Sequence, residues 1–581
     1  MSKKLIALLM AAMMLLSVAA ACGNEPAPAP TPTPTPAPSE PAPAPTPAPA
    51  DPTPAEPVDP DAEKYGGDLI VGESNVSSGM DLHQAGTSLG NSRWMNNIYE
   101  PLATWDANGK IYGVICDYEQ SEDGLVHTYT LRDRHFSNGK KITMEDIEAS
   151  LRRAIALGVT TEATYNKNFK GSTWTFTEDT LTVSFETFNL NFNDSMSSYA
   201  SVYKIMPKEI CEKYPFTGGT ATAEGFVWGA EGAMINEVED VIGSGPYTLT
   251  KWNGESEIVL TRNENYDIIT EGNEDAIGLA APQKAYCDTI TFAINADAAS
   301  RTAAMMAKEY HVALIQDSMV EAANAMGIIG EADGTTWTYS IFFNLHESNA
   351  DSPIADVNVR KAIRAAIDCN AAMLAVTGGN QDRIHLDPYP MVKTNTTYAN
   401  TIVEDSGEWN VHDVELAKKY LAQSNYNGEP IVYLTPSSGN IYNVAMAIIP
   451  QLEAIGLNIE LQIVDSGSHT AMRKDPATGH DIGGWIVQQY TTTPNHTSYV
   501  TGTAAGWWTN DVKTAALEVM NSSPVGSEKS VNAYKEILQA VVDEVPYIIM
   551  GRADTYLYRW PEVVTDFNGS TIYYWNSYFV K

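Results

Sequence analysis

The stretch from Ser121 to Arg153, SEDGLVHTYTLRDRHFSNGKKITMEDIEASLRR, constrains the fold more than any other part of the chain. Asp123-Gly124 and Phe136-Ser-Asn-Gly139 are turn signals, and His127 to Leu131 carries the β-branched and aromatic residues typical of a strand. Thr143 then stands as the N-cap of a segment with acidic residues in its first turn and apolar residues at helical spacing. The stretch predicts a strand, a turn and a capped amphipathic helix, in that order.

Length and charge bound the possible functions. The chain has 581 residues, too many for one core, so two or three domains are expected. The formal net charge of −36 disfavours nucleic acid and anionic membrane as partners, because both would be repelled. An acidic surface of this kind is typical of a soluble, well-solvated domain.

The five cysteines do not form a metal or redox motif. No two of them stand in a C-x-x-C pair, which argues against zinc-ribbon and thioredoxin-type sites. Four lie far apart in the body of the chain: Cys116, Cys211, Cys287 and Cys369. We expect buried free thiols, with a disulfide in an oxidising compartment as the alternative.

Residues 1–21 have the plan of an export signal. Lys3 and Lys4 supply charge, and the apolar run that follows is shorter than the ~20 residues of a membrane span. The sequence Ala19-Ala20-Ala21-Cys22 resembles a bacterial lipobox, with Ala19 where leucine is common. We expect a lipoprotein signal peptide over 1–21 and lipidation of Cys22. The alternative is an ordinary A-x-A cleavage site with an incidental cysteine.

Residues 22–63 form a segment rich in Pro, Ala and Thr that holds half of the chain's 32 prolines. Fixed φ angles and the lack of periodic large apolar residues prevent a core, so polyproline II is expected. At ~3.1 Å per residue such a segment reaches on the order of 100 Å. It is therefore predicted to be a disordered tether that lifts a folded domain off a membrane.

Motifs of catalysis and metal binding were sought without success. The sequence contains no H-E-x-x-H, no G-x-S-x-G and no Walker sequence. The ten histidines are scattered, and His469 and His480 are expected to be surface or loop residues without a metal partner. We therefore predict no catalytic residues, no metal and no cofactor.

The opening stretch resembles the signature of the family 5 extracytoplasmic solute-binding proteins of ABC importers, the group that binds oligopeptides, dipeptides and nickel. The shared pattern is a DG turn, a T-LR strand, an F-(S/N)-(D/N)-G turn and a (T/A)-x-(E/D)-D-(V/I)-x-x-S-(L/F) helix start. Matches stand at Asp123, Gly124, Leu131, Arg132, Phe136, Gly139, Thr143, Asp146, Ile147, Ser150 and Leu151.

Two further landmarks fit the same family. Gly243-Ser-Gly-Pro-Tyr247 followed by Arg262-Asn-Glu-Asn-Tyr266 resembles its G-(T/S)-G-P-Y and R-N-x-x-Y elements. Asp356 resembles the capping residue of its V-R-x-A-(I/L) helix, which we expect to run unbroken over residues 357–374. Helix, glycine and strand then follow one another around Gly456, as in an α/β module.

The resemblance implies an α/β fold with two lobes, of the large cluster C type of periplasmic-binding-protein-like folds, with an extra N-terminal subdomain. Lobe I is expected over 64–107, 240–339 and 545–581, with an inserted subdomain over 108–239. Lobe II is expected over 340–544, with chain crossings near Ser340 and Glu544. A monomer is expected.

The resemblance also suggests where a ligand binds. In the family, the chain after an apolar strand of the second lobe lines the cleft, and here that strand is expected over 481–490, DIGGWIVQQY. Peptide-binding relatives usually carry an aspartate near this point that pairs with the α-amino group of the peptide. Here the sequence is Gln488-Gln-Tyr-Thr-Thr-Thr493-Pro494, so the carboxylate is missing, which argues against a ligand with a free α-amino group.

The expected ligand contacts divide between two walls. On the second lobe we expect Trp485 and Tyr490, because aromatic side chains give large contact areas with few rotamers to freeze. Packing of Trp485 in the lobe core is the alternative, and packing is favoured over a lid for Trp507 and Trp508. The other wall is expected at Asn75, Ser77, Ser78 and Met80, which follow the first strand, and the alternative there is an ordinary polar loop. For Asn344 the alternative is a hydrogen bond to the hinge alone. The complete predicted set is Trp485, Gln489, Tyr490, Thr493, Asn344, Asn75, Ser78 and Met80, with Ser77 beside them.

The resemblance implies a substrate-binding lipoprotein outside the cytoplasm, anchored to the cell membrane through Cys22. It would close over a small solute, with peptide or a peptide-like compound as the default, and deliver it to the membrane permease of an ABC importer. Other possible ligands are nickel chelates, opines and glycosides. The alternatives are a sensory receptor of the same fold and, from a different class, a secreted lipoprotein hydrolase.

Overall fold

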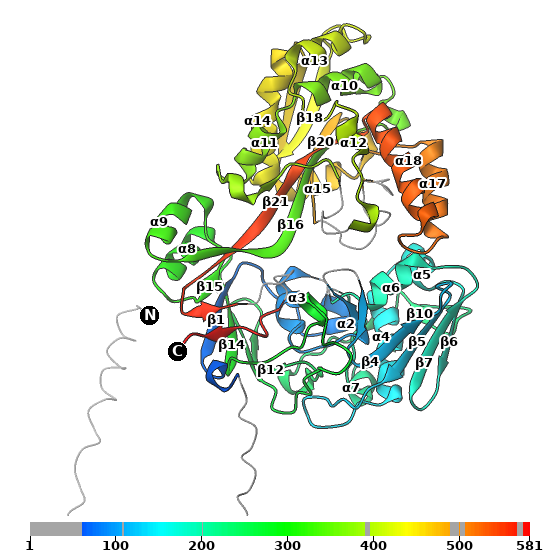
Figure 1. Ribbon diagram of the computed structural model, residues 1–581, viewed down its shortest axis with the longest axis vertical. Coiled ribbons are helices and arrows are strands. Elements are labelled where there is room, and N and C mark those ends of the chain that lie inside the picture. Colours follow the sequence, from blue (N-terminus) through cyan, green and yellow to red (C-terminus); the bar gives the residue numbers. More distant parts are fainter. Residues whose placement is uncertain are drawn as a thin grey trace, which may run out of the picture. The chain divides into compact units, whose positions relative to one another are not determined.

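The computed structural model describes residues 61–581 except 87, 107–109, 200, 390–395, 489–498, 500–505 and 566–572. The chain divides into two units, Met1–Val58 and Asp59–Lys581. The predicted signal peptide, Cys22 and nearly all of the predicted tether lie outside the described residues. All the elements below belong to the second unit (Figure 1).

A mixed sheet of eleven strands runs through this unit. The sheet combines parallel pairs, such as β1 with β14, and antiparallel pairs, such as β16 with β21. In spatial order its strands are β12 (Tyr247–Asn253), β13 (Glu257–Arg262), β14 (Thr289–Ile294), β1 (Asp68–Glu73), β15 (Val312–Ala313), β21 (Tyr547–Arg559), β16 (Ile329–Phe343), β20 (Ile482–Gln488), β18 (Pro430–Pro436) and β19 (Asn458–Val464), with β17 (Ile384–His385) paired to β21.

Strands β16 and β21 pass from one half of this sheet to the other. Near one end β21 pairs with β15, through Tyr558 and Arg559, and near the other end β16 pairs with β20 over Trp337–Phe343. Between these regions the register of β16 against β21 shifts between Ala332 and Thr336. The two strands lie side by side in Figure 1 and join two separate hydrophobic cores.

The first of these, the β1 core, surrounds the strands from β12 to β1 and holds the C-terminal aromatic residues. Trp94, Tyr247, Tyr574 and Trp575 are among its fully buried side chains. The small Trp560 core lies beside it, where Trp560 and Tyr558 pack on Met305. The helical elements of this region are η1 (Ala62–Lys64), α2 (Leu82–Ala85), α3 (Leu89–Met95), η2 (Val238–Asp240), η3 (Gly278–Ala280), α8 (Ala298–Met306), η4 (Asp317–Met319) and α9 (Val320–Ala325); the strands β22 (Val563–Val564) and β23 (Tyr578–Phe579) pair near the end of the chain.

A third hydrophobic cluster, here called the α4 core, includes Tyr129, Ile147 and Leu151 and so contains the stretch from Ser121 to Arg153 that most constrains the fold. The predicted strand is β5 (Val126–Leu131), and the predicted helix is α4 (Met144–Gly158) with Thr143 as N-cap. Thr143 and Asp146 bond each other's backbone in a capping box, which confirms the predicted helix start. The accompanying elements are β2 (Ala103–Trp105), β3 (Ile111–Gly113), β4 (Cys116–Gln120), α5 (Glu162–Phe169), β6 (Ser172–Phe176), β7 (Thr180–Phe185), α6 (Leu190–Met196), α7 (Lys208–Lys213), β8 (Phe216–Thr217), β9 (Thr220–Ala221), β10 (Val227–Trp228) and β11 (Glu231–Gly232).

Helices also pack on the other half of the large sheet. The hydrophobic cluster between them, here called the β18 core, includes Ile363, Tyr433 and Ile448. The helix expected over 357–374 is in fact two helices, because Ile367 is extended and Asp368 caps the second by accepting a hydrogen bond from the backbone N–H of Ala371. Helix α14 continues through Pro450. The helical elements are η5 (Glu347–Asn349), η6 (Pro353–Ala355), α10 (Val357–Ala366), α11 (Cys369–Val376), η7 (Gln381–Arg383), α13 (Val414–Leu421), α14 (Asn440–Ala454), α15 (Ser466–Met472) and η9 (Pro476–Thr478).

The α18 core lies next to it and is largely helical. Tyr534 and Ile537 of α18 are buried against Tyr547 and Ile549 of β21. Its helical elements are η8 (Thr396–Tyr398), α12 (Ile402–Asp405), α17 (Asp511–Asn521) and α18 (Glu528–Glu544).

Burial decides the state of the four cysteines in the described region. Cys116, Cys211, Cys287 and Cys369 are all buried free thiols, as expected from the sequence. Burial raises the pKa of Cys211 to about 11 and that of Cys287 to about 12, which keeps both thiols protonated.

Candidate ligand-binding site

Trp485 lies on β20, next to the strand that crosses between the two halves of the sheet. Its backbone is paired with Ser340 of β16, and its ring meets the ring of Phe342 edge to face at 5.4 Å. The side chain is half-buried and packs against the α18 core. Part of the indole therefore faces a niche lined by Phe342, Asn344, Arg473, His480, Gly483, Gly484, Trp485 and Gly506.

Arg473 is the charged group of this niche. It follows the last turn of α15, and its guanidinium carbon lies 3.5 Å from the centre of the Trp485 ring, a cation–π contact. Its Nη1 is buried and has no hydrogen-bond partner among the described residues. Burial lowers the pKa of Arg473, although an arginine remains charged at neutral pH. The niche thus presents a fixed positive charge with an unused donor.

Two histidines lie beside this arginine and stay neutral. His469 stands one helical turn before Arg473, and its buried Nε2 also lacks a partner among the described residues. Burial, with further contributions from Arg473 and His480, lowers the pKa of His469 to about 4. Burial also lowers the pKa of His480, whose Nδ1 lies 2.8 Å from the hydroxyl of Thr478. His480 does lie in a loop, as expected, but His469 lies on α15, and neither is a surface residue, because only 2% and 3% of their surfaces are exposed.

Asn344 is fully enclosed, and its amide is already bonded within the chain. Its Nδ2 donates to the carbonyl oxygens of Pro476 and His480, at 3.2 and 2.9 Å. Its Oδ1 accepts from the backbone N–H of His346 at 3.3 Å. The residue therefore fixes the loop before β20 to the end of β16.

The first predicted wall follows β1. Asn75 is half-buried and donates from Nδ2 to Glu73 Oε1 at 2.9 Å, while Ser78 is exposed and its hydroxyl accepts from Asn91 at 2.9 Å. Met80 is 5% exposed and belongs to the β1 core, and Ser77 is buried and bonded to Asn91. No contact between these four residues and Trp485 is present in the described part of the chain. The other predicted contacts, Gln489, Tyr490 and Thr493, lie outside the described residues, as does Pro494.

The tryptophan pair, Trp507 and Trp508, directly follows Gly506, one of the residues that line the niche. Trp508 is buried, and its indole N–H donates to Glu544 Oε2 at 2.6 Å. The Trp507 ring lies about 6 Å from the rings of both His346 and His480. The preceding Gly506 has φ +86°, and a Cβ there would lie 2.6 Å from the carbonyl oxygen of Phe343. Only glycine fits this turn, so the approach of the loop to β16 is fixed.

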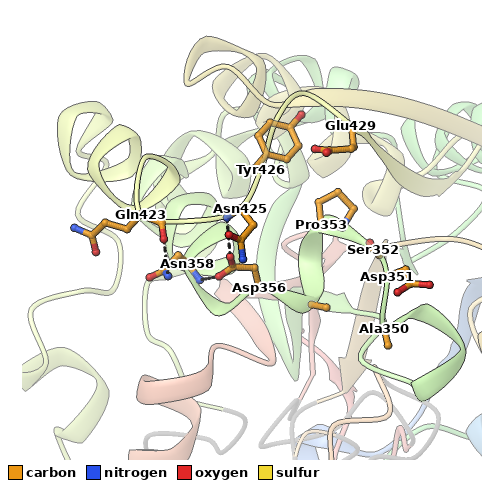
Figure 2. Close-up of a pocket in the computed structure, with 11 residues that line it drawn as sticks. Ala350, Asp351, Ser352, Pro353, Asp356, Asn358, Gln423, Asn425, Tyr426 and Glu429 are labelled. Carbon is orange, nitrogen blue, oxygen red and sulfur yellow. Dashed lines mark hydrogen bonds between the residues drawn. The ribbon is translucent and has the colours of Figure 1, made fainter.

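A larger groove of about 550 Å³ lies at the start of α10 and is separate from this niche (Figure 2). The carboxylate of Asp356 accepts two hydrogen bonds there. Its Oδ1 accepts from the backbone N–H of Asn358 at 2.8 Å, and its Oδ2 accepts from the backbone N–H of Asn425 at 3.0 Å. Glu429 accepts from the backbone of Asn427. The carboxylates of Asp356 and Glu429 thus support local turns. The groove is lined by Ala350, Asp351, Ser352, Pro353, Ala355, Asp356, Asn358, Gln423, Asn425, Tyr426 and Glu429.

The described residues offer no site for a metal or a membrane span. No group of three or more His, Cys, Asp or Glu side chains within them is arranged to hold a metal ion. None of the described helices combines the length and the apolar character needed to cross a bilayer.

The architecture and the niche together define a class. One sheet runs through two cores, two strands connect them, and the niche lies beside those strands, as in two-lobed binding proteins. A comparison with family profiles agrees: the profile named Bacterial extracellular solute-binding proteins, family 5 Middle matches residues 109–511. The chain belongs to this family.

Individual relatives are distant in sequence and similar in fold. The oligopeptide-binding protein OppA of Bacillus subtilis is 21% identical over 419 residues, which cover 68% of this chain and 70% of OppA. The crystal structure of the ABC transporter substrate-binding protein CtaP from Listeria monocytogenes has a TM-score of 0.69 at 17% identity, covering 89% of this chain and 100% of CtaP. That of NikA from Brucella suis, in complex with Fe(III)-EDTA, has a TM-score of 0.68 at 18% identity and covers 87% and 98%.

Proposed function

We propose that this protein is the substrate-binding lipoprotein of an ABC importer and that it captures a small solute bearing a carboxylate or a similar anionic group. Peptide or a peptide-like compound is the default ligand. Family membership and the name of OppA support the importer role and the peptide class. The anionic group is inferred from the niche around Arg473.

The observation that carries this proposal is the guanidinium of Arg473, stacked on Trp485 with a buried and unused Nη1. A buried donor without a partner costs free energy, so the niche is incomplete without an acceptor. A carboxylate would supply charge-assisted hydrogen bonds, and the face of Trp485 holds the guanidinium plane in place for them. No acidic side chain among the described residues forms an ion pair with Arg473, which leaves the position to a ligand.

Recognition of an anionic group by Arg473 is consistent with the lack of the aspartate that peptide-binding relatives usually carry after this strand. The chain lacks a carboxylate at Gln488–Pro494, where a ligand's α-amino group would need one. A ligand recognised by its anionic end needs no such partner. Peptides held by their carboxylate, opines and carboxylate-rich chelates share this chemistry.

The two-lobed fold gives the mechanism of capture. A ligand that touches both lobes favours their closed arrangement, because it makes all its contacts only there. We propose lobe I over 64–107, 240–339 and 545–581 with the subdomain 108–239, and lobe II over 340–544. The register shifts of β16 against β21, between Ala332 and Thr336 and between Tyr339 and Ser340, support a crossing of the chain on these two strands. Lipidation of Cys22 and the 22–63 tether would keep the receptor at the membrane beside its permease.

Mass spectrometry of the full-length protein, purified without denaturation, tests the proposal. We expect a co-purified small molecule with at least one carboxylate or similar anionic group. A thermal-shift panel of peptides, opines, sugars and metal chelates, each with a neutral amide or ester analogue, then ranks the classes, because a ligand of the folded state raises the melting temperature. Stabilisation by the neutral analogues equal to that by the acids would contradict the anionic-group proposal. Turnover of any compound in the panel would instead support the hydrolase alternative.

A further inference from the structure

The crossing between the lobes contains an ion pair that links them directly. Strands β16 and β21 are the covalent connections (Figure 1), and the register of their ladder shifts at two places, between Ala332 and Thr336 and between Tyr339 and Ser340. A sheet bends most easily where its ladder is broken, so the crossing is the expected pivot. Side chains that span this point can restrain the motion.

Arg383 reaches the pivot from lobe II. It ends η7 and leads into β17, which pairs with Arg552 and Ala553 of β21. Its Nε donates to the carbonyl oxygen of Asp554 at 3.2 Å, and its guanidinium carbon lies 5.5 Å from the centre of the Tyr556 ring. Only 13% of the side chain is exposed, so its position is well defined.

Asp317 approaches the same point from lobe I. It begins η4, which follows β15 and leads into α9, a helix of the Trp560 core. Its Oδ1 accepts a hydrogen bond from Arg383 Nη1 at 2.7 Å. The chains also come close here, because a Cβ on Gly378 would lie 3.1 Å from Asp317 Cβ, and the φ of Gly378 is +62°. This ion pair therefore joins segments of different lobes, far apart in sequence, at the pivot itself.

We propose that the Asp317–Arg383 ion pair is a hinge latch that holds the two lobes in the described arrangement when no ligand is bound. The Nε bond to Asp554 anchors the arginine on the crossing strand, and the Nη1 bond to Asp317 ties that strand to lobe I. An ion pair of this exposure contributes modestly to global stability. Open and closed forms of such proteins differ by little free energy, so the same pair can change their populations several-fold.

The latch is tested by measuring distances between the lobes in the ligand-free, full-length protein carrying Cys22→Ser. Spin labels are placed at Lys251→Cys on β12 and Glu415→Cys on α13, whose native side chains are 60% and 87% exposed. The four cysteines of the described region are buried and do not compete for label. Asp317→Asn removes the partner's charge and leaves the Arg383–Asp554 bond in place. We expect it to lower the population of the parent distance about threefold.

A double-mutant cycle separates the latch from general damage. Arg383→Gln should shift the distances in the same direction as Asp317→Asn, and the double variant should shift them no further than Arg383→Gln alone. The matched control is Arg262→Gln, which breaks the Arg262–Asp288 pair of similar exposure within lobe I and should leave the distances unchanged. Distance distributions of both single variants that superimpose on the parent, with unchanged melting temperature, would overturn the proposal. Because no ligand is used, the result does not depend on the ligand proposed above.

Discussion

Arg153 Nη2 lies 2.6 Å from Asp81 Oδ2 in an ion pair from which water is almost excluded, with 2% and 0% of the two side chains exposed. The partners come from different cores, since Asp81 caps α2 and Arg153 lies on α4. Arg153 also donates to the carbonyl oxygen of Tyr214, and Asp81 accepts from the backbone N–H of Ile235. One buried ion pair therefore ties α4 to the start of α2.

Loss of this pair should destabilise the whole protein. Arg153→Met leaves the Asp81 carboxylate buried without its counter-charge, and we expect the free energy of unfolding to fall by about 3–5 kcal/mol. Urea unfolding followed by circular dichroism measures the change. The matched control is the neighbouring Arg152→Gln, which removes an exposed i,i+4 pair with Glu148 and a hydrogen bond to the carbonyl oxygen of Gly225, and should cost no more than about 1–1.5 kcal/mol. Equal falls in the free energy of unfolding in the two variants would show that the buried pair contributes no more to stability than an exposed pair does.

Arg473→Gln should weaken binding of the co-purified ligand without harming the fold. A hydrogen bond to a charged group contributes about 1.5–3 kcal/mol, so the dissociation constant should rise by a factor of about 10–100. The free protein should lose no more than about 1 kcal/mol of stability, because the loss of the contact with Trp485 is offset by removal of a buried donor that lacks a partner. Titration calorimetry gives the affinity, and the adjacent exposed Lys474→Gln is the control. Unchanged affinity in Arg473→Gln would remove the anionic-group proposal.

Acid should destabilise the protein through its buried histidines. Burial lowers the pKa of His127 to about 4, whereas an unfolded histidine titrates near 6.5. The stability from keeping His127 neutral is complete above pH 6.5 and is lost as the pH falls towards 4, because the unfolded state takes up the proton first. His127→Phe should therefore show a fall in unfolding free energy between pH 7 and 4.5 that is roughly 2–3 kcal/mol smaller than that of the parent. Urea unfolding at both pH values is the measurement, and equal falls would mean that His127 does not contribute.

Gly243→Ala should be strongly destabilising. A Cβ at Gly243 would lie 2.1 Å from the carbonyl oxygen of Ile98, and neither backbone can move away cheaply. We expect a loss of about 3 kcal/mol or more, at the upper end of overpacking effects. Gly483→Ala is the control, since its Cβ would meet His480 only at 3.8 Å, an ordinary contact. Thermal unfolding compares the two, and a stable Gly243→Ala protein would show that the Gly243–Ile98 approach is adjustable.

Cys22→Ser should release the protein from the membrane. The predicted lipid attachment depends on this thiol, and without acylation no part of residues 22–63 is apolar enough to anchor the chain. Fractionation of cells expressing the parent and the variant, with incorporation of labelled palmitate, measures the change. The parent should stay in the membrane fraction and carry label, and the variant should appear in the soluble fraction without label. Membrane retention of the variant would count against lipidation of Cys22, and a parent already found unlabelled in the soluble fraction would point to the A-x-A alternative.

Local signals in the sequence predicted the scaffold well. Thr143 and Asp146 form the capping box because both partners lie within one turn, and the β5 strand needs only its own residues and a neighbour. The signal at Asp368 was present but misread, since an aspartate inside an apolar helical pattern is also an N-cap. The family pattern then supplied the two-lobed arrangement, which no local signal contains.

The candidate site was less predictable because it depends on distant contacts. Trp485 was identified from its strand, yet Arg473 was missed, since an arginine at a helix end is ordinary until its stacking partner is known. His469 and His480 looked like loop residues, and their burial comes from packing around β20. A charged side chain shortly before an aromatic strand, with no acidic residue at i±3 or i±4, was the one available hint for Arg473.

The tight approach of Gly243 to Ile98 has an evolutionary consequence. The glycine belongs to one of the landmarks by which the chain resembles its family, and steric fit between two backbones explains its presence without reference to any solute. In the niche, Gly506 is held by an approach of the same kind and Gly484 by a close approach to a side chain, and the side chains of Arg473 and Trp485 are the parts that can vary without meeting such an approach. A family landmark of this kind can therefore be required by steric fit alone, and its presence in a sequence identifies the scaffold without identifying the solute that the protein binds.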